Sequence, residues 1–210
     1  MSRPLVISDC DEVLLHMLLP WRDWAAEMQG IAFSLDRQDF SKSMHYVATG
    51  DLVSTEETWR LLELFFTHEM DRQYPIAGAI AAMRTLGEHA DVVVLTNLAD
   101  VHQEARTRQL LGHGLDIRVF TNQGPKGPAL QRILDEFQPS QAVFIDDIAQ
   151  HHSSVAELAP EVHRLHFCGE PTIAPLIRCA HQAGHAHARI DDWSGALPWL
   201  LARLHGENDD

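Results

Sequence analysis

The stretch "LVISDCDEVLL", residues 5–15, decides how this sequence is read. Leu5, Val6 and Ile7 form a short apolar run typical of a buried parallel strand, and Asp9 and Asp11 follow it directly. Two carboxylates two residues apart lie on the same side of an extended chain, so a cation, a shared proton or solvent must relieve their repulsion. Read alone, the stretch fits a solvated strand end equally well, and the rest of the chain has to decide.

The composition indicates a globular chain without a membrane span. Its 210 residues allow one substantial core with an inserted subdomain. Hydrophobic residues make up 45% and charged residues 22%, and no apolar run approaches the ~20 residues that a span requires. The first strand follows Met1 without the organisation of a signal peptide, so we expect a cytoplasmic protein. The three cysteines show no CxxC spacing, which indicates neither a disulfide framework nor a thiolate metal site.

The charge excludes one class of partner. A formal net charge of −14 without a basic cluster opposes binding to nucleic-acid backbones, so we expect no nucleic-acid polymer as partner. An acidic chain that handles an anionic substrate needs local positive charge from a metal, a helix N-terminus or a chosen lysine. Only Lys42 and Lys126 among the 16 basic residues are lysines, which draws attention to both.

Strand-like and helical patterns alternate after residue 74. Apolar strand-like runs occupy 91–97, 116–120, 142–146 and 161–167, and helical patterns occupy 75–89, 100–111, 127–137, 149–157 and 191–204. This alternation predicts an α/β fold with a doubly wound parallel sheet. Residues 15–73 interrupt it with helical and polar segments. We therefore predict a core from 1–14 and 74–210, with a small helical cap at 15–73 inserted after the first strand.

Two helices are predicted inside the insertion. The first covers 19–30, with Pro20 near its start and Gly30 near its end. The second covers 54–70 and begins with Ser54 and Glu57 in capping-box spacing. Apolar residues recur along it at helical intervals and predict its packed face: Trp59, Leu62, Phe66 and Met70.

Polar residues follow each predicted strand of the core where the strand ends. They are Asp9 and Asp11, then Thr96 and Asn97, then Lys126, then Asp146 and Asp147. The carboxyl ends of parallel strands share one edge of the sheet, where ligands of such folds bind. Each group alone is common in helix caps and turns. Together, acidic groups, a hydroxyl and a lysine are what metal-assisted phosphoryl transfer needs.

In this order the four groups resemble the motifs of the haloacid dehalogenase-like hydrolases. The matching stretches are "DCDEV", Thr96 of "VVVLTN", Lys126 and "VFIDD". The resemblance covers about 1–14 and 74–205, and it implies a Rossmannoid core that carries a cap in the segment 15–73. Two residues depart from the pattern: Glu12 stands where the family often has Gly, and His151 where it often has Asn.

The resemblance also implies a nucleophile and a metal. Asp9 would attack phosphorus and form an aspartyl-phosphate, which requires a cation to offset the charges of the carboxylate and the phosphate. Mg²⁺ suits an all-oxygen set made of Asp9, the backbone carbonyl of Asp11, and Asp146. Asp147 would complete the metal site through water or a hydrogen bond.

The remaining motif residues receive roles from the same resemblance. Asp11 would act as general acid and then general base, and its presence favours phosphate esters over halides or phosphonates as substrates. Thr96 and the backbone N–H of Asn97 would hold phosphoryl oxygens. Lys126 would bind the phosphate, balance the acidic cluster and orient Asp9.

The resemblance thus implies a Mg²⁺-dependent phosphatase acting on a small phosphorylated metabolite. A 5′-(deoxy)nucleotidase-like member of the same superfamily stays open as an alternative, and a non-catalytic phospho-acceptor module of the receiver type must also be considered. The order of motifs argues against a receiver, because an acidic pair follows Lys126 and the insertion has no place there. The sequence leaves the substrate and the oligomeric state open.

Two further features have a structural and a functional interpretation. The stretch "HQAGHAH" holds His181, His185 and His187, whose spacing allows a zinc site, but Gly184 interrupts the helix that such a site would need. Cys10 lies between the two aspartates, and its side chain is expected on the opposite face of the strand, where it would pack in the core.

Overall fold

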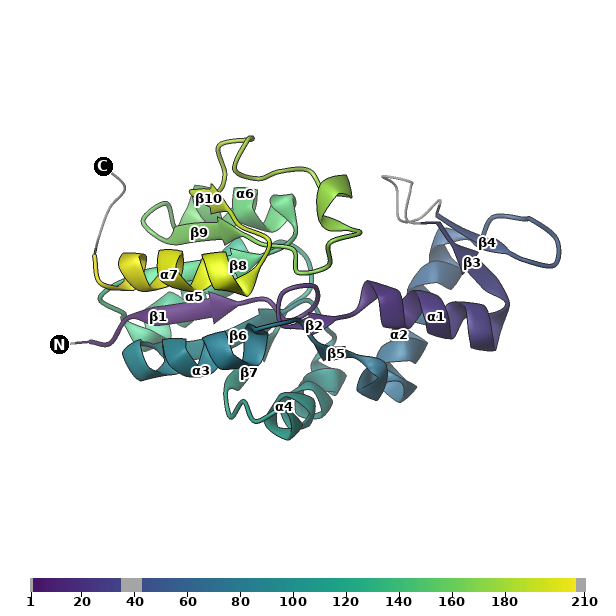
Figure 1. Cartoon of the computed structure of the whole chain (residues 1–210), viewed down its shortest axis with the longest axis horizontal. Helices are drawn as coiled ribbons and strands as arrows, with labels where there is room; N and C mark the ends of the chain where they lie inside the picture. Colours follow the sequence, from purple (N-terminus) through teal and green to yellow (C-terminus); the bar gives the residue numbers. More distant parts are fainter. Residues whose placement is uncertain (1, 35–42, 207–210) are drawn as a thin grey trace. The chain divides into compact units, whose positions relative to one another are not determined.

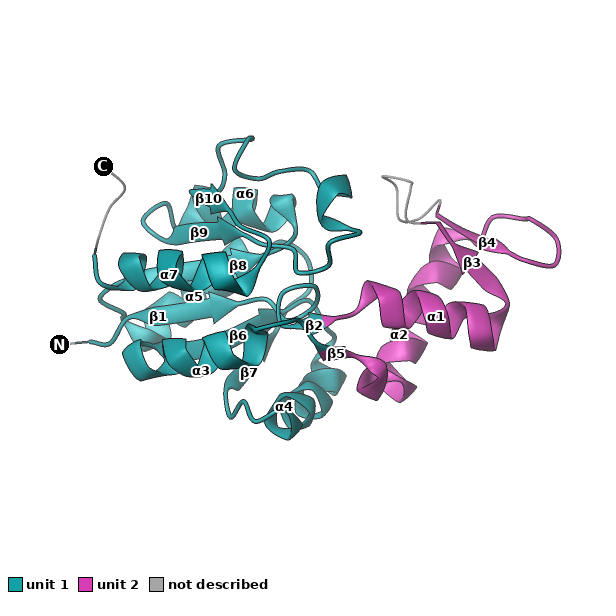
Figure 2. Cartoon of the chain, in the orientation of Figure 1, with its two compact units in different colours: residues 1–15, 75–210 teal, residues 16–74 magenta. Residues whose placement is uncertain are grey.

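The computed structural model describes residues 2–34 and 43–206 of the chain. Lys42 therefore lies outside the described residues. The chain divides into two compact units (Figure 2): unit 1 comprises 1–15 and 75–210, and unit 2 comprises 16–74. The expected boundaries of the insertion lay one residue earlier at each end. Within the described residues, no helix combines the length and the apolar character that crossing a bilayer demands.

Unit 1 contains a six-stranded sheet in the order β10-β9-β8-β1-β6-β7, and its strands pair in parallel (Figure 1). The strands are β1 (Leu5–Ser8), β6 (Asp91–Thr96), β7 (Arg118–Thr121), β8 (Ala142–Asp146), β9 (His163–His166) and β10 (Ala188–Arg189). The predicted α/β class with a parallel sheet is confirmed. The edge strand β10 was not predicted.

Helices cover both faces of this sheet. They are α3 (Ala79–His89), α4 (Gln103–Gly112), α5 (Gly127–Phe137), α6 (Ala149–Leu158) and α7 (Trp193–Leu204), with short 3₁₀ turns η3 (Asp100–His102) and η4 (Ala174–Leu176). Alternate residues of the strands face opposite layers. Val6 belongs to a hydrophobic cluster with α3 and α7, whereas Leu5 and Ile7 belong to a cluster with α5 and α6.

The strand order reverses beside β1. Ser8 at the end of β1 lies opposite Val94 of β6 on one side and Ile145 of β8 on the other. The chain leaves β1 toward β6 and β7, and then returns to β8 on the opposite side. In open α/β sheets, ligands usually bind beyond the carboxyl ends of the strands at such a reversal. The first and fourth sequence motifs leave the sheet at this point.

Unit 2 is not wholly helical. It contains α1 (Leu18–Gln29) and α2 (Thr55–His68) with the 3₁₀ turn η2 (Met70–Arg72), as the sequence indicated, but also an antiparallel pair of strands, β3 (Ile31–Phe33) and β4 (Met44–Tyr46). Gly30 ends α1 in the left-handed conformation, with φ of 61°, and turns the chain into β3. The chain passes between the units through β2 (Leu15–His16) and β5 (Tyr74–Pro75), which pair with each other.

The packed face of α2 matches the predicted one except at Trp59: Phe66 and Met70 are buried, and Leu62 is partly buried. The Ser54 hydroxyl accepts a hydrogen bond from the Glu57 N–H at 3.1 Å, which confirms the predicted start. Trp59 is 59% exposed, and the buried positions are Thr58, Leu61, Phe65 and Phe66. The buried face is wider than predicted, because it also includes the neighbouring stripe 61/65, which has the same helical spacing as 62/66.

Candidate functional site

Asp9 is the first residue beyond β1, and its carboxylate is held on one side. The backbone N–H of Asp9 donates to the Ile145 carbonyl at 2.8 Å, which extends the pairing of β1 with β8. Its Oδ1 accepts from the Cys10 N–H at 2.7 Å and lies 2.9 Å from Lys126 Nζ. Because Oδ1 has two donors, Oδ2 is the oxygen that remains for chemistry.

Lys126 joins the first and fourth motifs. It lies immediately before α5, is fully buried, and places Nζ 2.6 Å from Asp146 Oδ2 as well as 2.9 Å from Asp9 Oδ1. Burial opposes its charged form, but the charges of Asp146 and Asp9 outweigh burial and raise the pKa of Lys126. The lysine therefore stays charged and orients both carboxylates.

Three carboxylates meet beside this lysine. Carboxylate oxygens of Asp9, Asp146 and Asp147 lie within 4.8 Å of one another. Burial raises the pKa of Asp9 to about 7, Lys126 opposes that shift, and the charges of Asp146 and Asp11 add to it. Burial, then the charges of Asp146, Asp9 and Glu12, raise the pKa of Asp147.

One ammonium does not neutralise three carboxylates. The pKa of Asp146 is lowered, because Lys126 outweighs the effect of burial. Asp9 and Asp147, by contrast, are held above their usual range and would ionise together only beside a further positive charge. Oxygen donors at this spacing suit a hard divalent cation, which is the cation that the sequence motifs imply.

Two buried histidines, which the sequence analysis missed, contact the backbone carbonyls of Asp146 and Asp147, two residues here called the acidic turn. His152 Nε2 lies 2.9 Å from the Asp146 carbonyl, and His166 Nε2 lies 2.8 Å from the Asp147 carbonyl. Carbonyls only accept, so both nitrogens donate. Burial lowers the pKa of both rings, that of His152 to about 4, so they act as neutral donors. Their donation fixes the backbone that presents both aspartates.

Thr96 is the last residue of β6 and Asn97 follows it, and the two side chains have different surroundings. Thr96 is fully buried, and among the described residues its hydroxyl has no hydrogen-bond partner, so it can donate to a bound ligand. The Asn97 side chain donates to the Gly124 carbonyl at 3.0 Å, accepts from the Asn122 amide at 2.9 Å, and lies 3.3 Å from His151 Nε2. The Asn97 side chain therefore ties β6 to the loop before Lys126.

Asp11 has a partner that the sequence analysis missed. Fully buried Arg106 of α4 donates Nη1 and Nη2 to Asp11 Oδ1, both at 3.0 Å, and Nη2 to Oδ2 at 3.3 Å. Arg106 Nη1 also donates a hydrogen bond to Cys10 Sγ at 2.7 Å. Cys10 is buried, as expected, and its sulfur also accepts this hydrogen bond. The sequence contains one indication that Arg106 is buried: it lies four residues before Leu110 and therefore on the same, buried face of α4.

Glu12 adopts a left-handed backbone, with φ of 58°, and is 2% exposed. Its carbonyl accepts from the Gly169 N–H at 2.7 Å, which fixes the turn after Asp11. Glycine adopts this conformation without strain, whereas other residues seldom do. The departure at this position therefore brings backbone strain and a buried carboxyl group next to the aspartates.

The histidine stretch lies in turns after η4. The Nδ1 atom of His181 lies 3.1 Å from the carbonyl oxygen of Ala186. The Nδ1 atom of His187 accepts a hydrogen bond from the Arg164 N–H at 3.0 Å. In the part of the chain that the structure describes, the potential metal-ligand group is the one formed by Asp9, Asp146 and Asp147.

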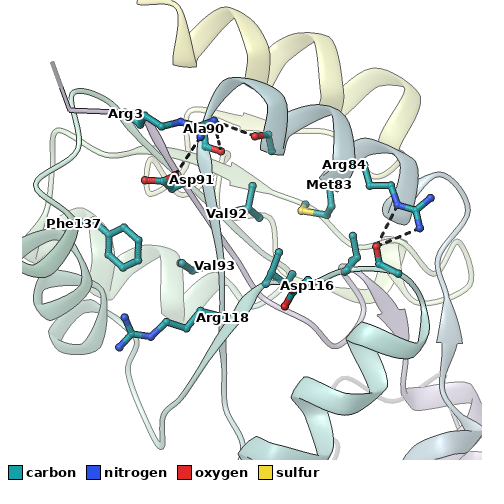
Figure 3. Close-up of a pocket in the computed structure, with 14 residues that line it drawn as sticks. Arg3, Met83, Arg84, Ala90, Asp91, Val92, Val93, Asp116, Arg118 and Phe137 are labelled. Carbon is teal, nitrogen blue, oxygen red and sulfur yellow. Dashed lines mark hydrogen bonds and ion pairs between the residues drawn. The ribbon is translucent and has the colours of Figure 1, made fainter.

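A surface pocket of about 410 Å³ lies away from these residues (Figure 3). Asp91 and Arg118, the first residues of β6 and β7, line it, so it lies at the opposite end of these strands from Thr96. Its arginines already have partners: Arg3 donates to the Ala90 carbonyl at 3.2 Å, and Arg84 to the Gly114 carbonyl at 3.2 Å. The pocket is therefore separate from the motif residues.

Comparison with solved structures identifies the fold. A haloacid dehalogenase-like family hydrolase from Streptococcus pneumoniae superposes with a TM-score of 0.66 at 12% identity, over 95% of this chain and 99% of that chain. A haloacid dehalogenase-like hydrolase from Xanthomonas campestris gives 0.64 at 18% identity, over 98% of each chain. A hydrolase of the same family from Deinococcus radiodurans, solved with bound phosphate and sodium, gives 0.66 at 18% identity, over 97% of each chain.

The sequence comparisons add no closer relative, since no family model and no curated protein sequence matches the chain. The structural likeness nevertheless extends along almost the whole of each neighbour. It agrees with the order of the four motifs along the sheet edge. The chain therefore has the fold of the haloacid dehalogenase-like hydrolases.

Proposed function

We propose that this protein is a phosphatase that hydrolyses small phosphomonoesters through an aspartyl-phosphate on Asp9, with Mg²⁺ as cofactor. The observation that carries the proposal is the buried group of Asp9, Asp146 and Asp147, in which Lys126 contacts Asp9 and Asp146. A nucleophilic carboxylate, a fixed ammonium and two further carboxylates are what phosphoryl transfer to an aspartate requires. The likeness to hydrolases of this fold, one of them solved with phosphate, supports it.

The donor set fits a divalent cation. Asp9 and Asp146 would hold it with the Asp11 backbone carbonyl, and Asp147 would complete the site. Burial and mutual repulsion hold the pKa of Asp9 and of Asp147 above the usual range, which is the state that a cation relieves. When bound, Mg²⁺ supplies the positive charge that lets an anionic nucleophile approach an anionic phosphoryl group.

In the first half of the reaction, the phosphoryl group is transferred from the ester to Asp9. Asp9 Oδ2 forms the new bond to phosphorus while the bond from phosphorus to the ester oxygen breaks and its electron pair stays on that oxygen. The Asp11 carboxyl group gives the oxygen a proton, so the alcohol leaves neutral. Thr96 donates a hydrogen bond to a phosphoryl oxygen, and Lys126 keeps Asp9 oriented.

The second half restores the enzyme. Water attacks phosphorus, Asp11 takes the proton of that water, and the bond between Asp9 and phosphorus breaks to give inorganic phosphate and free Asp9. Because His152 and His166 hold the backbone of Asp146 and Asp147, the acidic turn keeps its position throughout both halves.

Hydrolysis of p-nitrophenyl phosphate tests the proposal. We expect turnover with Mg²⁺, loss of turnover with a chelator, and recovery when Mg²⁺ is restored. Asp9→Asn should abolish turnover, because an amide is a poor nucleophile, whereas Asp116→Asn serves as the control because Asp116 is exposed at the opposite end of the sheet. An Asp9→Asn variant that keeps more than about a tenth of the wild-type kcat contradicts the assignment of the nucleophile.

A further inference from the structure

Arg106 joins α4 to the residues of the first motif. Its guanidinium is fully buried and forms three hydrogen bonds to the Asp11 carboxylate, at 3.0, 3.0 and 3.3 Å. A further hydrogen bond of 2.7 Å reaches Cys10 Sγ. The arginine thus contacts two consecutive residues directly after Asp9.

These contacts restrict how the Asp11 carboxylate can rotate. A guanidinium is planar and presents its N–H groups in a fixed fork, so contact with both carboxylate oxygens sets the plane of the carboxylate as well as its position. Arg106 itself is held by its burial and by its contact with Cys10. A bidentate contact from a packed side chain is therefore a rigid support for a group that must meet a reacting atom.

The Asp11 carboxylate keeps access to solvent despite this support, since its side chain is 16% exposed whereas Arg106 is 0% exposed. Arg106 has no exposed surface from which to touch a substrate, so it acts on the reaction through the residues that it contacts. Of the motif residues among these contacts, Asp11 is the one proposed to exchange a proton.

We propose that Arg106 is a positioning residue that holds the Asp11 carboxyl group in the orientation needed to exchange a proton with the ester oxygen. This inference rests on the proposed phosphatase function. The inference predicts that the effect of losing Arg106 depends on the leaving group of the substrate. An alkoxide leaving group needs the proton from Asp11, whereas p-nitrophenolate leaves readily without one. Loss of the support should therefore harm hydrolysis of an alkyl phosphate more than hydrolysis of an aryl phosphate.

The test compares kcat/KM for glycerol phosphate and p-nitrophenyl phosphate with Mg²⁺ in one set of variants. Arg106→Met should lower the alkyl-to-aryl ratio of kcat/KM by about tenfold or more, with the loss in kcat rather than KM. Arg106→Lys keeps the charge but not the fork and should recover part of the ratio. Arg108→Met is the matched control, since Arg108 is exposed on the same helix.

A double variant separates positioning from folding. In an Asp11→Asn background, Arg106→Met should cause no further change in the ratio, because the group that Arg106 orients no longer exchanges a proton. Thermal melting shows which variants are folded. If Arg106→Met is not folded, the same comparison is made with Arg106→Lys as a single variant and in the Asp11→Asn background. An unchanged ratio in the folded Arg106 variants, or effects that multiply in the double variant, overturns the inference alone. A wild-type protein inactive on both esters overturns the proposed function, and this inference with it.

Discussion

Glu12 adopts a backbone conformation that its own side chain disfavours. A non-glycine residue in the left-handed region loses about 1–2 kcal/mol relative to the right-handed one. Its buried carboxylate adds to the charges that raise the pKa of Asp147. Both effects reduce the stability of the folded protein, and both come from one side chain.

Glu12→Gly is therefore expected to raise the melting temperature in the absence of metal, by about 2–4 °C for a net gain of about 1 kcal/mol in a chain of this size. A carboxyl group with a raised pKa stabilises the fold fully below its unfolded pKa, and this contribution is lost as pH rises. Since Glu12 helps raise the pKa of Asp147, the gain should be larger at pH 8 than at pH 5. Thermal melts at both pH values measure it.

Glu12→Gln is the control for this experiment, because it removes the charge and keeps the strained backbone. We expect Glu12→Gln to raise the melting temperature more at pH 8 than at pH 5, as Glu12→Gly does, because both variants remove the charge. The part of the gain that comes from relief of backbone strain, which is the same at both pH values, should be absent in Glu12→Gln. A lower melting temperature for Glu12→Gly at both pH values would show that the Glu12 side chain supports the turn rather than straining it.

At the residue scale, the sequence predicted the groups that follow strands and missed those that support them. Asp9, Thr96 and Asp146 could be placed because each ends an apolar run, and parallel strands bring such ends to one edge. Arg106 and His166 come from a helix and a neighbouring strand, and their contacts depend on tertiary packing. A single sequence carries little information about such contacts beyond the buried face on which a residue lies.

At the element scale, the close approach of α5 and α6 places Lys126. A Cβ at Gly127 would overlap the Ser154 carbonyl oxygen and lie 2.6 Å from Ser154 Oγ. The Gly127 N–H donates to that same hydroxyl at 3.1 Å. Gly127 thus lets the start of α5 approach α6 closely, and this approach holds the backbone of the preceding Lys126.

Gly127→Ala is expected to destabilise the protein by about 1–3 kcal/mol, because backbone atoms rather than a flexible side chain must move to relieve the overlap. The movement should displace Lys126 and so lower kcat/KM for p-nitrophenyl phosphate. Gly87→Ala is the control, since Gly87 lies in α3 with open space around it, and alanine there should stabilise the helix by up to about 1 kcal/mol. Equal melting temperatures for both variants would contradict this account of the contact between α5 and α6.

Elements were predictable where one pattern had no competitor. β6 and β8 are uninterrupted apolar runs of the kind that a central parallel strand requires, and both were placed correctly. The predicted face of α2 was wrong at Trp59 and missed Leu61 and Phe65, because two adjacent stripes have the same spacing. The pairing of β3 with β4 was missed because both strands are three residues long. Short strands gain their stability from a partner, which local sequence does not reveal.

At the scale of the whole molecule, unit 2 is inserted into the sequence of unit 1 between its first strand and the rest of its sheet. Both hydrophobic clusters lie wholly within unit 1, and so do the motif residues. The chain leaves unit 1 at Leu15 and re-enters it at Pro75, in two strands that pair with each other. Paired strands lie about 5 Å apart, so a short linker can join these ends.

Unit 2 is expected to act as a cap that selects small phosphomonoesters and excludes polymers. Its insertion directly after the turn that carries Asp9 and Asp11 supports this expectation. A cap that closes over bound substrate excludes water from the aspartyl-phosphate and lets contacts with the rest of the substrate favour closure. A substrate that offers few such contacts gains little from the cap.

Replacement of residues 16–74 by a short Gly/Ser linker should therefore lower kcat/KM for the best substrate of a phosphomonoester panel at least about tenfold more than for p-nitrophenyl phosphate. Both activities are measured on the same variant, after thermal melting has shown that unit 1 is folded. The intact protein is also assayed on a phosphoprotein, which a cap should exclude. If both small substrates lose the same factor, or if the intact protein hydrolyses the phosphoprotein as readily as the small esters, unit 2 does not select the substrate, and selectivity must come from residues of unit 1.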